Sequence, residues 1–379
     1  MAQGAQGPLV TVDDWERAAR ARLVPMAYDY FRSGADEEHS LHRNREAYAR
    51  YAIHYRTLVD VGAANTTTTL LGHELKTPIL VAPTAYHRMA HVGGEAASAG
   101  GTADAGSLFV VSSLATTSLE DIAAVTPKGP RWFQLYVHRD RAFTDRLVER
   151  ARAAAYSAIA VTVDAPVLGR RVRDVQNGFA LPRGLAMENL KEAIPDALKD
   201  GDGSELARYV AARHDPSFSI TDLEALVKRA APLPIVVKGI VRGDDARRAI
   251  DVGAAAIWVS NHGGRQLDFA PATLDVLPEV RAAAAGRVPV VVDGGIRSGT
   301  HALIALARGA DAVFVGRPVI WGLTVGGREG VRTILELLHA ELCRSMALAG
   351  APDLASLRHD LVRPHAEPRD EPPREPRGA

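Results

Sequence analysis

The sequence has a single cysteine, Cys343, among its 379 residues. One cysteine excludes an internal disulfide and a cysteine zinc cluster, and it suits a reducing compartment. The chain also lacks an excess of either charge, because 45 lysines and arginines balance 45 aspartates and glutamates. Without a global basic field, we expect neither nucleic acid nor an anionic membrane as the main partner. These absences favour chemistry on a small molecule.

Long apolar runs are missing as well. No stretch of ~18 apolar residues occurs, and the start, MAQGAQGPLV, lacks a basic segment followed by an apolar one. We therefore expect a cytoplasmic protein that has no membrane partner. No G-x-G-x-x-G opens a βαβ unit, and neither a Walker lysine motif nor H-E-x-x-H occurs. Nicotinamide Rossmann, P-loop and zinc-protease hypotheses lose support, and we predict no metal site.

What the sequence does contain is an alternation of short β-branched runs with helical patterns. Near-continuous apolar strands between amphipathic helices are typical of parallel strands that are buried on both faces. Eight in succession fit a closed (β/α)8 TIM barrel of the α/β class better than an open doubly wound sheet. The runs are TPILVAPT, LFVVSS, RWFQLYV, AIAVTVD, PIVVKG, AAIWVSN, VPVVVDGG and DAVFVGR.

The segment that precedes the barrel, TVDDWERAARARLVPMAYDYFRSGADEE, predicts helices. Thr11 or Asp13 would cap the first helix, Trp15 and Ala18 follow at helical spacing, and Gly34 would close the next helix. We therefore assign residues 1–76 to an N-terminal helical cap.

Three further segments complete the predicted organisation. Residues 77–363 form the barrel, and together with the cap they make one unit, 1–363. The stretch from Arg183 to Phe218, after the fourth strand, is long and charged, which predicts a partly helical lid over the barrel mouth. Residues 364–379 are rich in proline and charge, which predicts a disordered tail.

Polar residues follow most of the eight runs, and in such a barrel the carboxyl ends of the strands meet at the active-site face. The densest cluster is VSNHGGRQLD. His262 is a candidate base or acid, because imidazole ordinarily titrates near neutrality, and Arg265 offers a planar fork for a carboxylate. A lone histidine at a strand end more often caps or packs, so the cluster gains weight from the other strand ends. These are Thr84, Ser112, Asp164, Lys238, Asp293 and Arg317, and within the cluster Asn261 also stands at the strand end.

Three more motifs carry possible chemistry. In VTVDAPVLGRR, Asp164 could orient an imidazolium, whereas the pair Arg170–Arg171 taken alone is typical of solvated surface. VVDGGIRSG and FVGRP place glycines and arginines at the seventh and eighth strand ends, where this barrel commonly binds phosphate. Lys238 could hold a phosphate, form a Schiff base or stabilise charge on a cofactor ring, and the residues alone leave these roles open.

Taken in order, YDYFRSGADEE, PTAYHRMAH, FQLYVHRD, VTVDAPVLGRR, VVKGI, SNHGGRQLD, VVDGGIRSG and VFVGRP resemble the FMN-dependent α-hydroxy acid oxidase and dehydrogenase family. The resemblance runs from about Val12 to Leu361. It implies FMN as the cofactor and oxidation of an (S)-2-hydroxy acid to a 2-oxo acid. It also implies a homotetramer, by analogy with family members.

The resemblance implies a role for each site residue. His262 takes the substrate proton and Asp164 supports the imidazolium. Arg171 and Arg265 bind the carboxylate, and Tyr30 and Tyr136 donate hydrogen bonds to the substrate. The residues implied for FMN are Pro83, Thr84, Ala85, Ser112, Gln134, Thr162, Lys238, Ser260, Asp293, Gly294, Gly295, Arg297, Gly316 and Arg317.

The chain departs from glycolate oxidase at two places. Leu114 stands where that enzyme has tryptophan, and Tyr86–His87 replaces methionine–glutamine, so we expect a reshaped pocket rather than glycolate specificity. The insertion after strand four is charged, unlike that of membrane-bound relatives, and no haem domain precedes the barrel, which favours O2 as the acceptor and H2O2 as a product. A soluble dehydrogenase, an internal monooxygenase, an FMN barrel isomerase and a non-catalytic flavin-binding protein are the alternatives.

Overall fold

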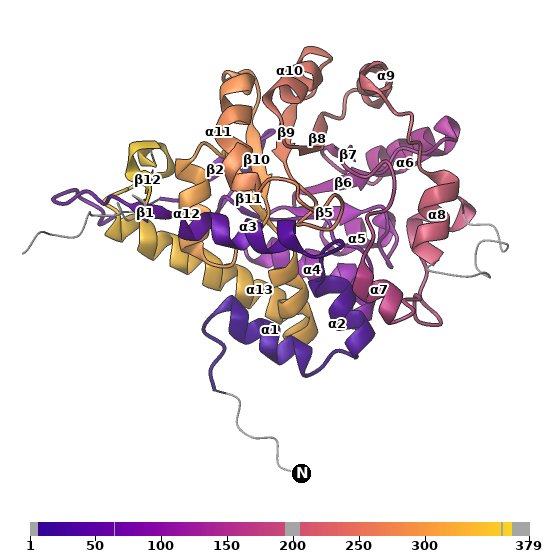
Figure 1. The fold of residues 1–379 in the computed structure, drawn as a ribbon, viewed down its shortest axis with the longest axis horizontal. Helices are drawn as coiled ribbons and strands as arrows, with labels where there is room; N and C mark the ends of the chain where they lie inside the picture. Colours follow the sequence, from indigo (N-terminus) through magenta and orange to yellow (C-terminus); the bar gives the residue numbers. More distant parts are fainter. Residues whose placement is uncertain (1–6, 64, 194–204, 358, 366–379) are drawn as a thin grey trace, which may run out of the picture.

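The protein is described by a computed structural model that covers residues 7–63, 65–193, 205–357 and 359–365. Eight parallel strands close into a barrel in the order β10-β11-β4-β5-β6-β7-β8-β9, so the predicted (β/α)8 barrel is confirmed (Figure 1). Seven strands lie within the predicted apolar runs, and β8 extends one residue beyond its run, to Ile240. The strands are β4 (Ile79–Val81), β5 (Phe109–Ser112), β6 (Arg131–Leu135), β7 (Ile159–Thr162), β8 (Ile235–Ile240), β9 (Ala256–Val259), β10 (Val290–Asp293) and β11 (Ala312–Val315).

Helices surround the barrel, and several begin where a polar side chain caps the first turn. Ser118, Asp140 and Ser298 each accept a hydrogen bond from a backbone N–H three residues further on, which satisfies one of the free donors at a helix start. The surrounding helices are α4 (Gly94–Asp104), α5 (Leu119–Val125), α6 (Arg141–Ala153), α9 (Ile220–Ala230), α10 (Gly243–Asp251), α11 (Thr273–Ala284), α12 (Gly299–Ala307) and α13 (Arg317–Leu348).

Large aromatic side chains fill the inside of the barrel. Trp132, Trp258 and Phe314 are buried, and the rings of Trp258 and Phe314 stack with their centroids 3.8 Å apart. The hairpin of β2 (Thr68–Leu70) and β3 (His73–Leu75) adds Leu70 and Leu75 to this interior cluster. The barrel is therefore a packed core, and open space is found at the carboxyl ends of its strands.

The N-terminal cap holds three helices, α1 (Val12–Arg20), α2 (Pro25–Arg32) and α3 (His39–Ala49), and α1 and α2 lie beside α13 (Figure 1). Thr11 caps α1, as predicted: its hydroxyl accepts from the Asp14 N–H at 3.2 Å, and the Asp14 carboxylate accepts from the Thr11 N–H at 2.8 Å. The prediction that Gly34 closes α2 is wrong, because α2 ends at Arg32, Ser33 caps it, and Gly34 does not have the left-handed conformation of a closing glycine. Gly34 serves close packing instead, since a Cβ there would lie 2.8 Å from the Gly264 carbonyl oxygen.

The cap also contains strands that the sequence did not predict. Besides β2 and β3, β1 (Tyr51–Ile53) pairs with β12 (Val362–Pro364) in an antiparallel ribbon. The remaining short elements are η1 (His87–Met89), α7 (Val172–Gln176), η2 (Glu188–Ala193), α8 (Glu205–Arg213), η4 (Leu354–Ser356) and η5 (His359–Leu361).

The predicted lid and tail are only partly described. Within 183–218 the structure has η2 and α8, which confirms partly helical character, whereas 194–204 lie outside the described residues. Of the predicted tail, 366–379 also lie outside them. Across the described residues, no helix combines the length and the apolar character needed to cross a membrane.

Candidate active site

A deep cavity opens at the carboxyl ends of the barrel strands, with an empty volume of about 1150 Å³ that includes space open to solvent. It brings together residues from eight strands' ends, from α2 and from α8. Of the site residues predicted from the sequence, all but Asp164 and Ser260 line it. Those that do are Tyr30, Pro83, Thr84, Ala85, Ser112, Gln134, Tyr136, Thr162, Arg171, Lys238, His262, Arg265, Asp293, Gly294, Gly295, Arg297, Gly316 and Arg317.

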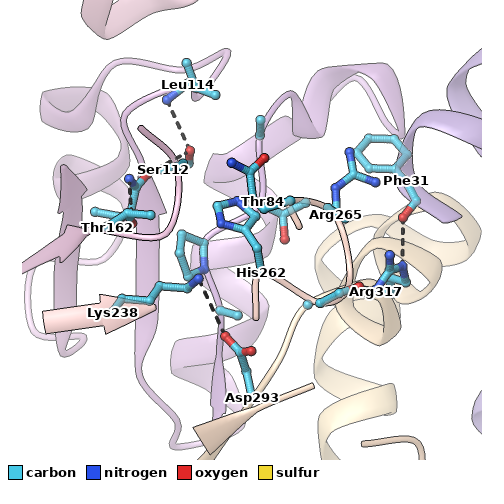
Figure 2. Close-up of a pocket in the computed structure, with 18 of the residues that line it drawn as sticks. Phe31, Thr84, Ser112, Leu114, Thr162, Lys238, His262, Arg265, Asp293 and Arg317 are labelled. Carbon is cyan, nitrogen blue, oxygen red and sulfur yellow. Dashed lines mark hydrogen bonds and ion pairs between the residues drawn. The ribbon is translucent and has the colours of Figure 1, made fainter. Parts of the chain in front are cut away.

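His262 lies at the centre of the cavity, between Lys238 and Arg265 (Figure 2). Its Nδ1 is 2.8 Å from Asp164 Oδ1, and its Nε2 is 3.3 Å from the Tyr136 hydroxyl. Because an ionised carboxylate only accepts hydrogen bonds, Nδ1 carries the proton and Nε2 keeps its lone pair. His262 can therefore accept a proton at Nε2, and Asp164 can stabilise the imidazolium that results.

The loop after β9 holds His262 in an unusual backbone conformation. His262, Gly263 and Gly264 have φ of 59°, 63° and 76°, all in the left-handed region. Glycine occupies this region without steric cost, whereas histidine does so only when its surroundings hold it there. The His262 N–H donates to Ser260 Oγ at 3.0 Å, so Ser260 supports this loop although it does not line the cavity.

Electrostatics keep the His262–Asp164 pair in the charge state of a base with its supporting carboxylate. Burial lowers the pKa of His262 below its ordinary value and outweighs the opposite effect of Asp164. Burial raises the pKa of Asp164, but the charges of His262 and Lys238 lower it by more, so that the net pKa lies below the ordinary value. Near neutral pH the imidazole is thus free to receive a proton while the carboxylate is ionised.

Two arginines, Arg171 buried and Arg265 half-buried, face this base around the ring of Tyr30. The guanidinium carbons of Arg265 and Arg171 lie 5.0 and 5.9 Å from the centre of that ring. Arg265 Nη1 donates to the carbonyl oxygens of Tyr30 and Ser33, at 2.6 and 2.8 Å. Arg171 is buried, whereas Arg170 is exposed, so the solvated-surface interpretation holds only for Arg170. Two guanidinium groups beside one base suit a carboxylate on the same small molecule.

A second cationic region lies where β10 and β11 end. Arg297 and Arg317 bind backbone carbonyl oxygens, of Ile296 for the first and of Phe31, Gly263 and Ser33 for the second. Among the described residues, neither forms an ion pair with an aspartate or glutamate, and Arg297 Nε is buried without a partner. Burial lowers the pKa of Arg297 to about 10 and that of Arg317 well below its usual range. Half-buried cations that have no carboxylate partner are expected to bind an anion.

Backbone beside these arginines offers room for that anion. Gly294 and Gly295 have φ of 104° and 79°, and a Cβ on Gly295 would lie 1.9 Å from the Asn44 carbonyl oxygen, so only glycine fits there. Gly316 starts α13, and no side chain caps this helix start. A helix start that no side chain caps, together with two arginines, is the kind of site that binds a phosphate group.

Polar side chains line one side of the cavity at the ends of β5 to β8. Ser112 pairs with Gln134 in register, and Gln134 Nε2 donates to Thr162 Oγ1 at 3.0 Å. Next to them, Lys238 Nζ donates to Ser260 Oγ at 3.0 Å, and Ser260 Oγ donates to the Asp293 carboxylate at 2.9 Å. This row of alternating donors and acceptors matches a flat, polar heterocycle such as a flavin.

Several cavity residues were not identified from the sequence. Leu206, Val210 and His214 form a wall on and just after α8, and their spacing of four residues inside the predicted lid was a usable signal. Gln266 fixes the loop that carries Arg171, because it binds the Gly169 N–H and the Val167 carbonyl oxygen, at 3.0 and 2.9 Å. Its place directly after Arg265 was its only signal.

Of the positions at which the chain departs from glycolate oxidase, one lines the cavity and the other two lie outside it. Leu114 lines the cavity. Tyr86 is not among the lining residues and packs behind Tyr30, with ring centroids 5.4 Å apart, and its hydroxyl lies 3.4 Å from Met187 Sδ. His87 is buried too, with Nδ1 2.8 Å from Ser98 Oγ. Of these substituted positions, only Leu114 therefore lines the cavity.

Comparison with known proteins agrees with this geometry. The sequence model of a family described as FMN-dependent dehydrogenase matches residues 19–364. L-lactate oxidase of Nostoc sp. is 49% identical over 355 residues, which cover 92% of this chain and 96% of that protein. 2-Hydroxyacid oxidase 1 of Homo sapiens is 46% identical, with 94% and 96% covered. A crystal structure of mandelate oxidase superposes with a TM-score of 0.86 at 42% identity, with 94% of this chain and 98% of that chain covered. The chain belongs to the FMN-dependent dehydrogenase family.

Proposed function

We propose that the protein is an FMN-dependent oxidase that converts an (S)-2-hydroxy acid to the 2-oxo acid and reduces O2 to H2O2. Two electrons and two protons leave the hydroxyl-bearing carbon and its oxygen, and O2 takes up both pairs. The observation that carries the proposal is the base at His262 Nε2, supported by Asp164 at 2.8 Å and faced by the buried Arg171 and the half-buried Arg265. Base and cations together suit one molecule that has both a hydroxyl and a carboxylate.

The residues of the cavity fit FMN. Arg297 and Arg317, which form no ion pair among the described residues, would hold its phosphate together with the close-packed Gly294 and Gly295 and with Gly316 at the start of α13. The flavin ring would lie along the strand ends, against Pro83, Thr84, Ala85, Ser112, Gln134, Thr162 and Lys238, with Ser260 and Asp293 orienting Lys238. When bound, FMN supplies the two-electron acceptor that no amino-acid side chain provides.

The remaining side chains act on the substrate itself. Arg171 and Arg265 would bind the carboxylate and turn the 2-hydroxyl toward His262, with Tyr30 and Tyr136 donating hydrogen bonds. Nε2 receives a proton from the substrate, and Asp164 stabilises the positive imidazole because it accepts the Nδ1–H. Burial raises the pKa of Tyr136 above its ordinary value, so its hydroxyl remains a donor throughout.

The proposal is tested by mixing the FMN-loaded protein anaerobically with a panel of 2-hydroxy acids while flavin absorbance is recorded. We expect bleaching by (S)-acids, followed after admission of air by recovery and about one H2O2 per 2-oxo acid. A decarboxylated acid with little peroxide would indicate internal monooxygenation, and recovery only with quinones or dyes would indicate a dehydrogenase. A yellow protein that no 2-hydroxy acid bleaches would refute the proposal.

Three further expectations remain predictions. We propose that residues 1–363 act as one functional unit in which 1–76 cap the barrel of 77–363. The α1–α3 helices support this, since Tyr30 and Phe31 complete the cavity. A cytoplasmic location and a homotetramer are also proposed. Fractionation and light scattering test them.

A further inference from the structure

Helix α3 carries three buried polar residues, Ser40, Asn44 and Tyr48, on one face. They are four residues apart, so they follow one another along the helix. None of them lines the cavity or entered the proposed mechanism. Polar groups are buried at a cost unless they are hydrogen-bonded, and each of these three bonds a loop at the mouth of the barrel.

Asn44 and Asn261 form a reciprocal amide pair. Asn44 Nδ2 donates to Asn261 Oδ1 at 2.8 Å, and Asn261 Nδ2 donates to Asn44 Oδ1 at 2.9 Å. The same two oxygens accept further backbone donors: the Gly264 N–H at 3.2 Å on Asn261, and the Thr273 N–H at 3.3 Å on Asn44. Asn261 Nδ2 also donates to the Pro271 carbonyl oxygen, at 3.0 Å. This pair therefore ties both ends of the loop after β9 to α3.

The pair lies directly beside the base. Asn261 stands between Ser260 and His262 in the chain, and the left-handed turn of His262 to Gly264 starts at this point. Because the Asn261 side chain is bonded on both its oxygen and its nitrogen, its backbone cannot rotate without breaking these bonds. The direction in which the His262 imidazole leaves the loop thus depends on a residue in the N-terminal cap.

The other two polar residues of α3 hold the neighbouring segments. At one end, Ser40 Oγ donates to the Ala270 carbonyl oxygen at 3.0 Å, and the Asp268 carboxylate accepts the Ser40 N–H at 2.8 Å. At the other end, the Tyr48 hydroxyl donates to the Gly294 carbonyl oxygen at 3.0 Å. One helix therefore contacts both the loop that carries the base and the loop that is proposed to bind phosphate.

We infer that Asn44 is a positioning residue, which sets the orientation of His262, and that Tyr48 separately sets the phosphate loop. The inference rests on the proposed function, since it assigns Asn44 to the proton-accepting half of the site and Tyr48 to the FMN-binding half. A displacement of about 1 Å at a reacting group can cost on the order of 100-fold in rate. Asn44 acts through such a displacement, without contacting the substrate.

The test compares Asn44→Leu, which has a similar volume but no amide, with Tyr48→Phe. For Asn44→Leu we expect FMN affinity near that of the wild type, KM for the hydroxy acid little changed, and a kcat for flavin reduction that is ~10- to 100-fold lower. For Tyr48→Phe we expect the reverse: an FMN dissociation constant raised roughly 3- to 10-fold by the loss of one neutral hydrogen bond, and near-normal reduction at saturating FMN. FMN affinity is read from the quenching of FMN fluorescence, with no turnover.

Glu46→Leu, on the exposed face of the same helix, is the matched control and should change neither quantity. Reduction of Asn44→Leu at the wild-type rate would overturn the inference, and so would equal losses of FMN affinity and kcat in both α3 variants. If Asn44→Leu does not fold, Asn44→Asp repeats the test, because it keeps the acceptor for Asn261 Nδ2 and replaces the donor with a negatively charged oxygen. A wild type that is not bleached would instead refute the proposed function.

Discussion

Arg170 and Arg171 are adjacent in sequence, yet only Arg171 is buried, with 7% of its surface exposed. Replacing each with methionine keeps an unbranched side chain and removes the charge. A guanidinium that hydrogen-bonds a carboxylate contributes roughly 1.5–3 kcal/mol. At about 1.4 kcal/mol for each factor of ten, Arg171→Met should lower kcat/KM for 2-hydroxy acids by ~10- to 100-fold. Arg170→Met should leave it nearly unchanged, because an exposed charge is screened by solvent and salt.

The assay is anaerobic flavin reduction by a 2-hydroxy acid and by the matching uncharged 2-hydroxy amide. If Arg171 recognises the carboxylate, Arg171→Met should affect the acid far more than the amide. Equal losses for acid and amide would show that the arginine supports the fold of the loop rather than the substrate. A loss in Arg170→Met as large as that in Arg171→Met would refute the distinction drawn from burial.

Four other predictions concern the base, its charge, the pocket and the acceptor. His262→Gln should keep FMN bound and slow flavin reduction by ~100-fold or more, the effect of removing a positioned base, and near-normal reduction would exclude that role. Because the pKa of His262 is lowered, kcat/KM should fall with decreasing pH only below pH 6.5. Asp164→Asn removes the charge that raises this pKa, so the fall in kcat/KM should move to still lower pH. A shift of the fall to higher pH would contradict this assignment. Leu114→Trp should reduce the preference for 2-hydroxyoctanoate or mandelate over glycolate, since each buried methylene contributes roughly 0.8 kcal/mol, and an unchanged order would show that Leu114 does not set the pocket. Air should reoxidise the reduced flavin rapidly, because the small side chain of Ala85 lines the cavity and leaves room for O2. The amount of H2O2 formed per 2-oxo acid checks this prediction.

The barrel could be predicted because its strands are buried on both faces and therefore appear as uninterrupted apolar runs. β1 and β12 could not, since each has three residues and its partner lies about 310 residues away along the chain, at Tyr51 and Pro364. Gly34 was misjudged for a related reason. A side chain at Gly34 would collide with the backbone of Gly264, which is far away in sequence, so the glycine is required by this contact and not by a local helix end.

The chemistry of the site was more predictable than its supports. His262, Arg265 and Lys238 stand at strand ends, where the barrel fold alone brings reactive groups together. The family resemblance then implied a role for each of them. Asn44 looks like any polar residue of a surface helix, because its partner Asn261 lies 217 positions further on. Supporting contacts between distant segments leave no local pattern, whereas strand-end chemistry does.

Arg265, Arg297 and Arg317 also have a meaning for the protein without its cofactor. The charges of Arg265 and Arg297 lower the pKa of Arg317, which means that Arg317 is repelled by both of the other cations in this cavity. The fold must carry that repulsion until a dianion neutralises it, so FMN is a counter-ion as well as a reagent. Because the unfolded chain has no such site, free FMN shifts the unfolding equilibrium toward the folded form by mass action. The lifetime of this protein in a cell is thereby linked to the supply of flavin.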